Sequence, residues 1–215
     1  MLRLVIGNKN YSSWSLRAWL ALRQVGIDFE EIQIPLGQPD SLEVKLRHSP
    51  AGKVPVLIDG DTRVWESLAI LDHLAERFPE AALWPADGDA RALARSVSAE
   101  MHAGFDPLRS HMFMNCRSRF PGKGREPGVM EDVERIREIW RDCRARHGRG
   151  GELLFGDFTI PDAMFAPVVL RFETYAVELD ATCRAYADAI LRLPAMAEWL
   201  EAAEREPWTI PQYEY

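Results

Sequence analysis

The sequence predicts an α/β domain followed by an all-helical domain. Over residues 1–78, segments with strand-like patterning alternate with segments of helical periodicity. Residues 79–89 are rich in proline and acidic side chains, which is typical of a linker. Residues 90–215 show helical patterns and no convincing strand. We therefore place the first domain at 1–78, the linker at 79–89 and the helical domain at 90–215.

The first domain contains alternating short strands and helices. In order, they are a strand at 2–6, a helix from Ser13 to the stop signal at Gly26, a strand at 28–34, a helix at 41–48, strands at 54–58 and 62–65, and a helix at 66–78. Asp59-Gly60 between the last two strands is a strong hairpin signal. The first two strands pair in parallel through a helical crossover, whereas the hairpin is antiparallel. This order predicts a mixed four-stranded sheet with helices on both faces, the thioredoxin-like arrangement.

The second domain is predicted to be helical throughout. The helical segments are 90–118, 129–147, 162–178, 183–192 and 195–204. Pro107 is expected to kink the first of them. Thr159 precedes Asp162 by three residues, which resembles a capping box, and Pro161 lies near the first helical position. We interpret this last pattern as structural.

Composition argues against nucleic acid, membrane and metal as partners. Lys and Arg total 26 against 33 Asp and Glu, a net charge of -7, with no long basic run. No apolar stretch approaches the roughly 20 residues of a transmembrane helix, and the N-terminal apolar run is too short for a secretory signal. Cys116, Cys143 and Cys183 lack metal-ligand spacing. We expect free thiols, a cytoplasmic location and no bound metal.

A polar loop between the first strand and the first helix is the first candidate site. It is part of "NKNYSSWSLRAWLAL", and it follows a strand end, where open α/β sheets bind ligands. A serine hydroxyl at the helix N-terminus could donate to a thiolate. Lowering a thiol pKa by one unit needs about 1.4 kcal/mol, which one hydrogen bond and the helix dipole together supply. The alternative is that Ser12 or Ser13 only caps the helix.

Two further motifs lie in the same domain. Pro55 interrupts the apolar strand of "SPAGKVPVL", and a cis bond before it would expose the Val54 backbone to an extended peptide ligand. The alternative is a trans proline on an edge strand. Glu66 and Ser67 begin a helix directly after a strand. They could hold an ammonium and a carboxylate, or could form an ordinary acidic helix start.

Together these motifs resemble those of the cytosolic glutathione S-transferase family, in particular its bacterial, serine-type members. "SSWSLRAWLAL", "SPAGKVPVL", "ESLAI" and "FTIPDAMFAP" follow the family's order and spacing along essentially the whole chain. The resemblance implies a thioredoxin-like N-terminal domain, an all-α C-terminal domain and a homodimer. It also implies glutathione as co-substrate and a detoxifying transfer of alkyl or aryl groups.

The resemblance also implies a catalytic residue. Serine-type classes place the catalytic hydroxyl five residues before an arginine of the first helix, so Arg17 implies Ser12. The zeta-class pattern Ser-Ser-Cys-x-x-Arg is similar to "SSWSLR", with Trp14 in place of the cysteine. The other polar side chains of the loop stay as alternates: Ser13, Asn10 and Tyr11.

The family resemblance also implies the residues that bind glutathione and the second substrate. The glutathione site implied by the resemblance consists of Lys53, Val54, Pro55, Glu66 and Ser67. The second substrate is expected between the domains, against the first long helix of the second domain. Candidates for an adaptable apolar pocket there are Met101, Phe105, Leu108 and Met112, with His102 and Arg109 as polar members.

The implied reaction is attack of the glutathione thiolate on a small apolar electrophile. Two alternatives use the same residues. One is a glutathione-dependent isomerase or peroxidase on the same site, and the other is a non-catalytic binding module of the same fold.

Overall fold

The computed structural model describes all 215 residues, and its N-terminal part is built on a mixed sheet. The four strands lie in the order β2-β1-β3-β4. Their bounds are β1 Leu2–Ile6, β2 Phe29–Gln33, β3 Val56–Asp59 and β4 Thr62–Trp65. β1 pairs in parallel with β2 and antiparallel with β3, which forms an antiparallel hairpin with β4. The predicted thioredoxin-like sheet is therefore confirmed.

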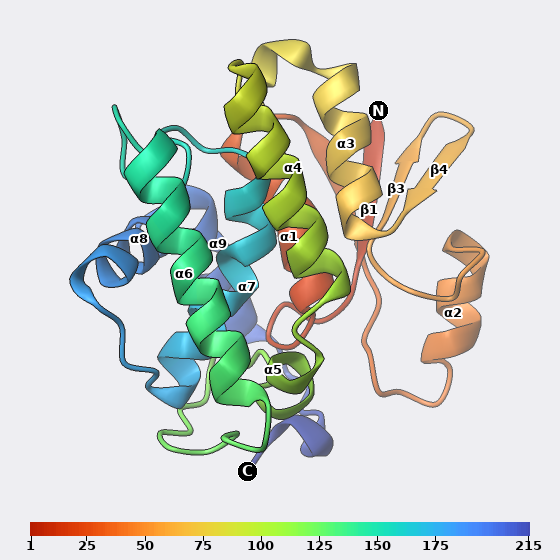
Figure 1. Cartoon of the computed structure of the whole chain (residues 1–215). Coiled ribbons are helices and arrows are strands. Elements are labelled where there is room, and N and C mark those ends of the chain that lie inside the picture. The colour runs from red at the N-terminus through yellow and green to blue at the C-terminus, as the bar shows by residue number, and fades with distance from the viewer.

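Helices cover both faces of this sheet (Figure 1). They are α1 (Ser13–Gln24) and α3 (Ser67–Arg77) on one face and α2 (Ser41–His48) on the other. Successive strand residues point to opposite faces. Leu4 and Leu57 accordingly join the main core, whereas Val5 and Val56 form a smaller cluster against Val44 of α2.

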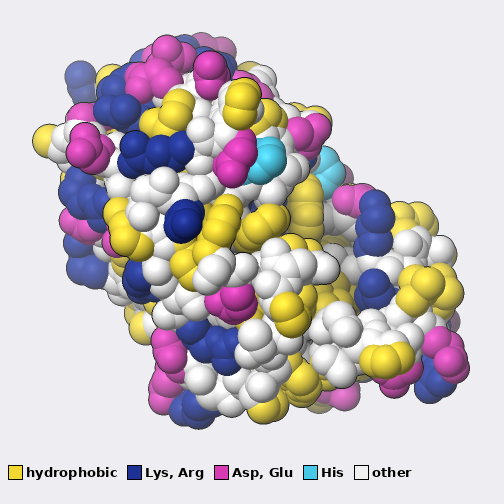
Figure 2. Space-filling view, turned by 90° about the horizontal axis from the view of Figure 1, so that it is seen from below, with side chains coloured by type: hydrophobic (Ala, Val, Ile, Leu, Met, Phe, Trp, Pro, Cys, Tyr) yellow, Lys and Arg dark blue, Asp and Glu magenta, His cyan; other side chains and the backbone are white.

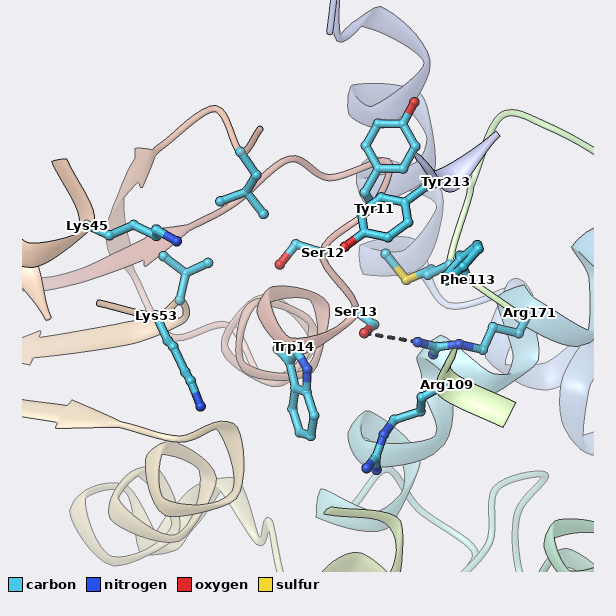
Figure 3. A pocket seen from close by; sticks show the side chains of 13 residues that line it. Tyr11, Ser12, Ser13, Trp14, Lys45, Lys53, Arg109, Phe113, Arg171 and Tyr213 are labelled. Carbon is cyan, nitrogen blue, oxygen red and sulfur yellow. Dashed lines mark hydrogen bonds between the residues drawn. The ribbon is translucent and has the colours of Figure 1, made fainter. Parts of the chain in front are cut away.

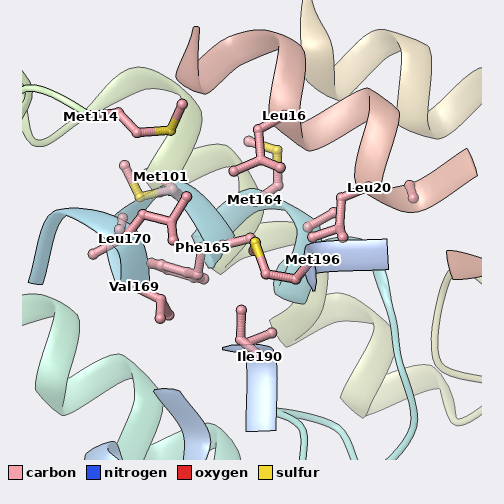
Figure 4. Packing of buried hydrophobic residues seen from close by; sticks show 14 of the residues in the cluster. Leu16, Leu20, Met101, Met114, Met164, Phe165, Val169, Leu170, Ile190 and Met196 are labelled. Atoms are coloured by element: carbon pink, nitrogen blue, oxygen red, sulfur yellow. The ribbon is translucent and has the colours of Figure 1, made fainter. Parts of the chain in front are cut away.

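The remainder of the chain is helical, apart from turns and loops, of which the longest covers residues 112–128. Its helices are α4 (Gly88–Ala103), α5 (Asp106–His111), α6 (Val129–His147), α7 (Ile160–Tyr175), α8 (Ala181–Leu191) and α9 (Pro194–Arg205). α7 is buried along its whole length except at Glu173. α1 packs against α7 and α9, where its Leu16 and Leu20 meet Met164 and Met196 (Figure 4). This contact joins the sheet to the helical part.

The predicted single helix at 90–118 is wrong. α4 ends at Ala103, and Phe105 adopts a left-handed conformation with a φ of 62°. Pro107 then lies in the first turn of α5, where a missing N–H costs no helical hydrogen bond. The proline therefore begins a new helix and does not kink a continuous one.

The three cysteines are free, as predicted, and all of them are buried. Burial raises the pKa of the Cys116, Cys143 and Cys183 thiols to about 12, so none is a ready nucleophile. No group of three or more His, Cys, Asp or Glu side chains is placed to hold a metal ion. None of the helices has both the length and the hydropathy needed to cross a bilayer.

Asp162 holds the start of the central helix α7. Its fully buried carboxylate accepts hydrogen bonds from the Thr159 N–H at 2.9 Å, the Thr159 hydroxyl at 3.0 Å and the Leu154 N–H at 3.1 Å. Burial raises the pKa of Asp162 to about 6. The predicted structural role of this pattern is confirmed.

Asp162→Ala is expected to lower the free energy of unfolding by about 2–4 kcal/mol, because three buried donors lose their acceptor. The native carboxyl takes up a proton near pH 6, before the unfolded one does near 3.8, so the loss should grow as the pH falls between these values. Urea denaturation at several pH values measures both effects.

Asp180→Ala removes a more exposed helix cap from α8 and serves as the control, with an expected loss of about 1 kcal/mol in the free energy of unfolding. Equal losses in the two variants would contradict the buried role of Asp162.

Candidate functional site

The loop between β1 and α1 opens into a cavity of about 310 Å³ (Figure 3). Ser12, Ser13 and Trp14 form its floor. The sheet side contributes Leu36, Lys45, Lys53 and Val54, and the helical side contributes Arg109, Phe113, Met114, Arg171 and Tyr213. The cavity therefore lies between the two parts of the molecule. On the face shown in Figure 2, apolar side chains gather where these parts meet, and acidic side chains lie mainly toward the edge.

A second cavity of about 160 Å³ adjoins the first. It is lined by Trp14, Trp65 and all five residues that the sequence assigned to glutathione: Lys53, Val54, Pro55, Glu66 and Ser67. Trp14, Lys53 and Val54 line both cavities. The two cavities are therefore neighbours that share one wall, and together they form a candidate site with two compartments.

Val54 presents a free stretch of backbone to this site. The Val54–Pro55 peptide bond is cis, and β3 begins only at Val56. Neither the N–H nor the C=O of Val54 forms a hydrogen bond within the chain. Both groups can therefore pair with an extended peptide, as in strand addition.

Glu66 and Ser67 form the turn into α3. Glu66 has a φ of 68°, a conformation that costs a non-glycine residue about 1–3 kcal/mol and that clusters at functional sites. Its carboxylate lies 3.5 Å from Nε2 of His102, whose pKa is lowered by burial and by the charge of Arg17. The Ser67 hydroxyl is buried without a partner at a helix N-terminus, which suits a carboxylate ligand.

The two candidate serines point in opposite directions. Ser12 caps α1, and its Oγ is directed toward the side of the cavity that carries Lys45 and Lys53 (Figure 3). Ser13 Oγ instead accepts a hydrogen bond of 3.2 Å from Nη2 of Arg171 on the helical side. Both serines line the larger cavity, where Ser12 faces the sheet side that includes Val54 and Ser13 faces the helical side.

The other two alternates form hydrogen bonds with segments outside the loop, although the Asn10 Nδ2 has no partner. Asn10 is fully buried and lines neither cavity, and its Oδ1 accepts from the N–H groups of Cys116 and Arg117 at 2.8 and 3.0 Å. The Tyr11 ring lines the larger cavity, but its hydroxyl donates to Glu214 at 2.6 Å. Both side chains tie the loop to distant segments.

The C-terminal tail contributes contacts that the sequence did not predict. The Glu206 carboxylate accepts from the N–H groups of Lys9 and Asn10 at 2.6 and 3.0 Å, just before the serines. Tyr213 reaches the cavity wall and packs against Phe113, with ring centroids 5.0 Å apart. The aromatic-rich ending "PWTIPQYEY" is the one sequence signal that could have suggested this role.

The predicted apolar second-substrate residues do not line either cavity. Met101, Phe105, Leu108 and Met112 are buried in the main core, where Figure 4 shows Met101. The reason is the break before α5, which turns this face toward α6 and α7. Of the two predicted polar members, Arg109 lines the larger cavity and His102 lines neither. Phe113 and Met114 line the cavity in place of the predicted apolar residues.

Positive charge dominates the larger cavity. Four cations line it, Lys45, Lys53, Arg109 and Arg171, and no carboxylate does. Arg171 is buried and donates only to neutral oxygens, those of Met112, Pro167 and Ser13. Burial and the nearby charge of Arg109 lower the pKa of Arg171 to about 10, so it stays charged at neutral pH. Although the net charge of the protein is -7, the charge around this cavity is positive and attracts anions.

A thioredoxin-like sheet with an attached helical part, and a site at the β1–α1 loop, defines the glutathione transferase fold. The family model of the glutathione S-transferase N-terminal domain matches residues 11–77. A maleylacetoacetate isomerase from Rattus norvegicus is 30% identical over 175 residues, which span 78% of this chain and 76% of the relative. The chain belongs to the glutathione S-transferase family.

Further relatives agree with this assignment. A probable maleylacetoacetate isomerase from Caenorhabditis elegans is 25% identical over 82% of this chain and 88% of its own length. A glutathione transferase homologue from Burkholderia, solved with bound glutathione, superposes with a TM-score of 0.73 at 22% identity, over 95% of this chain and 99% of its own. A bacterial maleyl pyruvate isomerase of the zeta class gives a TM-score of 0.70 at 22% identity, over 97% and 100% of the two chains.

Proposed function

We propose that this enzyme binds glutathione in the smaller compartment and activates its thiol with the Ser12 hydroxyl. The thiolate then attacks an electrophilic carbon of a small molecule held in the larger compartment. The observation that supports this most directly is the position of Ser12 in the larger cavity, which is also lined by Val54 with its unpaired backbone and by Arg109 and Arg171.

The chemistry of the walls suggests how glutathione lies. The Glu66 carboxylate would take the γ-glutamyl ammonium, and the α3 N-terminus with Ser67 would take the adjoining carboxylate. The Val54 backbone would pair with the cysteinyl residue. Lys53 lies where the glycyl carboxylate would end. This orientation directs the thiol toward Ser12.

The required activation is within reach of one hydroxyl. A free thiol has a pKa of about 8.5 and is only a few per cent ionised at neutral pH. A hydrogen bond to a charged group contributes about 1.5–3 kcal/mol, which lowers the thiol pKa by roughly one to two units. Proximity of the bound electrophile supplies the rest of the rate enhancement.

A second candidate function is isomerisation of an unsaturated carboxylate, and Arg109 and Arg171 favour it. The two guanidinium groups suit a carboxylate better than the small apolar molecule that the sequence predicted. The thiolate would add to one carbon of a cis double bond, the resulting single bond would rotate, and elimination would return the thiolate and the trans product. The names of the rat and nematode relatives are consistent with this alternative.

One experiment separates these possibilities. Calorimetric titration with reduced glutathione comes first, since absence of binding would overturn both candidates and favour a non-catalytic module. Turnover is then measured with a neutral aryl halide, a hydroperoxide and a cis-unsaturated dicarboxylate. Formation of a glutathione conjugate indicates the transferase, a trans product indicates the isomerase, and glutathione disulfide indicates a peroxidase.

Glu66→Gly is expected to weaken glutathione binding about tenfold, because one charge-assisted contact with the ammonium is lost. The variant should unfold no more easily than the parent, since glycine accepts a φ of 68° without strain. Calorimetry and urea denaturation measure the two effects. Ala82→Gly is the matched control, because Ala82 also has a positive φ, 46°, and lines neither cavity. An unchanged dissociation constant in Glu66→Gly would remove Glu66 from the glutathione site.

We also propose a homodimer, as the family resemblance implies. Sedimentation equilibrium tests this directly, because the chain mass is 24.5 kDa. A mass near twice this value supports the dimer, and the single-chain mass contradicts it.

A further inference from the structure

Ser15 lies directly behind Ser12, in the first turn of α1, and its side chain has no exposed surface. The Gly7 N–H, at the end of β1, donates to Ser15 Oγ at 3.0 Å. Ser15 Oγ lies 2.8 Å from Ser12 Oγ, and the Ser15 N–H donates weakly to the same Ser12 oxygen at 3.4 Å. A continuous row of polar groups therefore runs from the sheet to the cavity.

The direction of the bond between the two hydroxyls follows from counting donors and acceptors. Each hydroxyl has one proton and can accept two hydrogen bonds. The 2.8 Å contact allows donation in either direction, because both hydroxyl protons can rotate. Ser15 Oγ has no hydrogen-bonded oxygen other than Ser12 Oγ to which its proton could go. If Ser12 donated to Ser15, the Ser15 proton would be buried without an acceptor, which is costly. If Ser15 donates to Ser12, the fully buried Ser15 hydroxyl is satisfied, and only the Ser12 proton is left, which can point into the cavity.

We propose that Ser15 is a positioning residue for thiol activation: it donates its proton to Ser12 Oγ and thereby directs the Ser12 proton at the glutathione sulfur. This inference rests on the proposed role of Ser12. With glutathione bound, the order of donation runs from the Gly7 N–H to Ser15 Oγ, from the Ser15 hydroxyl to Ser12 Oγ, and from the Ser12 hydroxyl to the thiolate. Hydrogen bonds arranged in one direction strengthen each other, so Ser12 becomes a better donor than an isolated serine.

The backbone around Ser12 is built to keep this row in place. A Cβ on Gly7 would lie 3.2 Å from the Ser12 Cβ and 2.6 Å from Cδ1 of Leu36. Only glycine lets the strand end come this close to the serines without displacing a side chain. The Ser12 N–H also donates to the Asn8 carbonyl at 2.8 Å, which fixes the Ser12 backbone. The remaining freedom of Ser12 is the rotation of its hydroxyl, which Ser15 controls.

The test is the pKa of the glutathione thiol in the enzyme complex, followed by the ultraviolet absorbance of the thiolate as the pH is raised. It is measured for the parent and for Ser12→Ala, Ser15→Ala and the double variant. We expect Ser15→Ala to raise this pKa by roughly half of the rise that Ser12→Ala causes, with glutathione affinity nearly unchanged. The double variant should match Ser12→Ala alone, because Ser15 acts only through Ser12.

Two further variants separate this role from a structural one. Ser15→Thr keeps the hydroxyl and should restore most of the parental thiol pKa. Ser98→Ala removes another fully buried helical serine, whose hydroxyl has no partner, and should leave the thiol pKa unchanged.

The outcomes keep the two proposals distinguishable. An unchanged thiol pKa in Ser15→Ala, with a raised one in Ser12→Ala, would overturn the role of Ser15 and leave Ser12 in place. Additive rises in the double variant would likewise show that Ser15 acts independently of Ser12. An unchanged thiol pKa in Ser12→Ala would overturn the proposed function itself.

Discussion

Ser12→Ala is expected to reduce the turnover of glutathione with an electrophile about 10- to 100-fold near neutral pH. The lost hydrogen bond to a thiolate is worth about 1.5–3 kcal/mol, and each 1.4 kcal/mol is a factor of ten. Glutathione affinity should change little, because its contacts with Val54, Glu66 and Ser67 remain. Steady-state kinetics at saturating glutathione, together with calorimetric binding, measures both quantities.

The pH dependence of the same variant gives an independent check. Turnover rises with pH as the bound thiol ionises, so the rising limb of the pH profile follows the thiol pKa. Without the Ser12 donor this pKa moves upward, and the limb should shift to higher pH by roughly one to two units. The deficit of the variant should therefore shrink as the pH is raised. A deficit that persists at high pH would indicate a structural defect and not lost thiol activation.

Ser13→Ala is the matched control for this experiment. Ser13 lines the same cavity and follows Ser12 directly, but its hydroxyl is bonded to Arg171. It should leave the thiol pKa unchanged and affect only the second substrate. Full turnover in Ser12→Ala combined with its loss in Ser13→Ala or Asn10→Ala would transfer the catalytic role to another residue of the loop.

The sheet and the grouping of residues in the smaller compartment could be predicted because their signals are local. Short apolar strands, the Asp59-Gly60 turn and the helix starts each depend on a few consecutive residues. Val54 and Glu66 lie at the ends of such elements, so the topology that brings them together follows from strand order. Local sequence patterns of this kind are therefore enough to predict where these residues lie, and no tertiary contact has to be known in advance.

The larger compartment could not be predicted in the same way, because distant segments form it. Arg171 lies within the almost wholly buried helix α7, where the sequence pattern indicates only core. Tyr213 reaches the site through a tail that follows the last long helix. Periodicity does not reveal such contacts.

The break after α4 did leave a local signal that the helical pattern concealed. A Cβ on Gly104 would lie 2.9 Å from the Glu100 carbonyl oxygen, so the chain leaves the helix at a position that requires glycine. The left-handed Phe105 follows. A glycine three residues before a proline favours an end and a new start over a kinked helix. Recognising it would have moved the predicted apolar lining from Met101 and Leu108 toward Phe113 and Met114.

Arg171 is expected to decide which second substrates are accepted. A buried guanidinium without an acidic partner binds a carboxylate strongly, because neither group is well hydrated there and no internal ion pair must be broken. Arg171→Met should lower kcat/KM for an unsaturated dicarboxylate about 30- to 1000-fold, the range for losing one side of a buried charged contact. Turnover of a neutral aryl halide should change less than about threefold, since its contacts are apolar.

Arg171→Met should lose activity with the dicarboxylate but keep nearly all of its free energy of unfolding. This combination distinguishes a binding role of Arg171 from a structural one. Burial lowers the pKa of Arg171 to about 10, so its charge is held in the native protein at a cost in free energy. Methionine removes that cost, although it leaves the Met112 and Pro167 carbonyls without a donor. The free energy of unfolding should therefore fall by no more than about 1 kcal/mol. Arg109→Met, at a more exposed position beside Asp106, should give a smaller loss with the same dicarboxylate. Equal losses with anionic and neutral substrates, or a large loss of stability in Arg171→Met, would show that the arginine supports the fold and does not select the substrate.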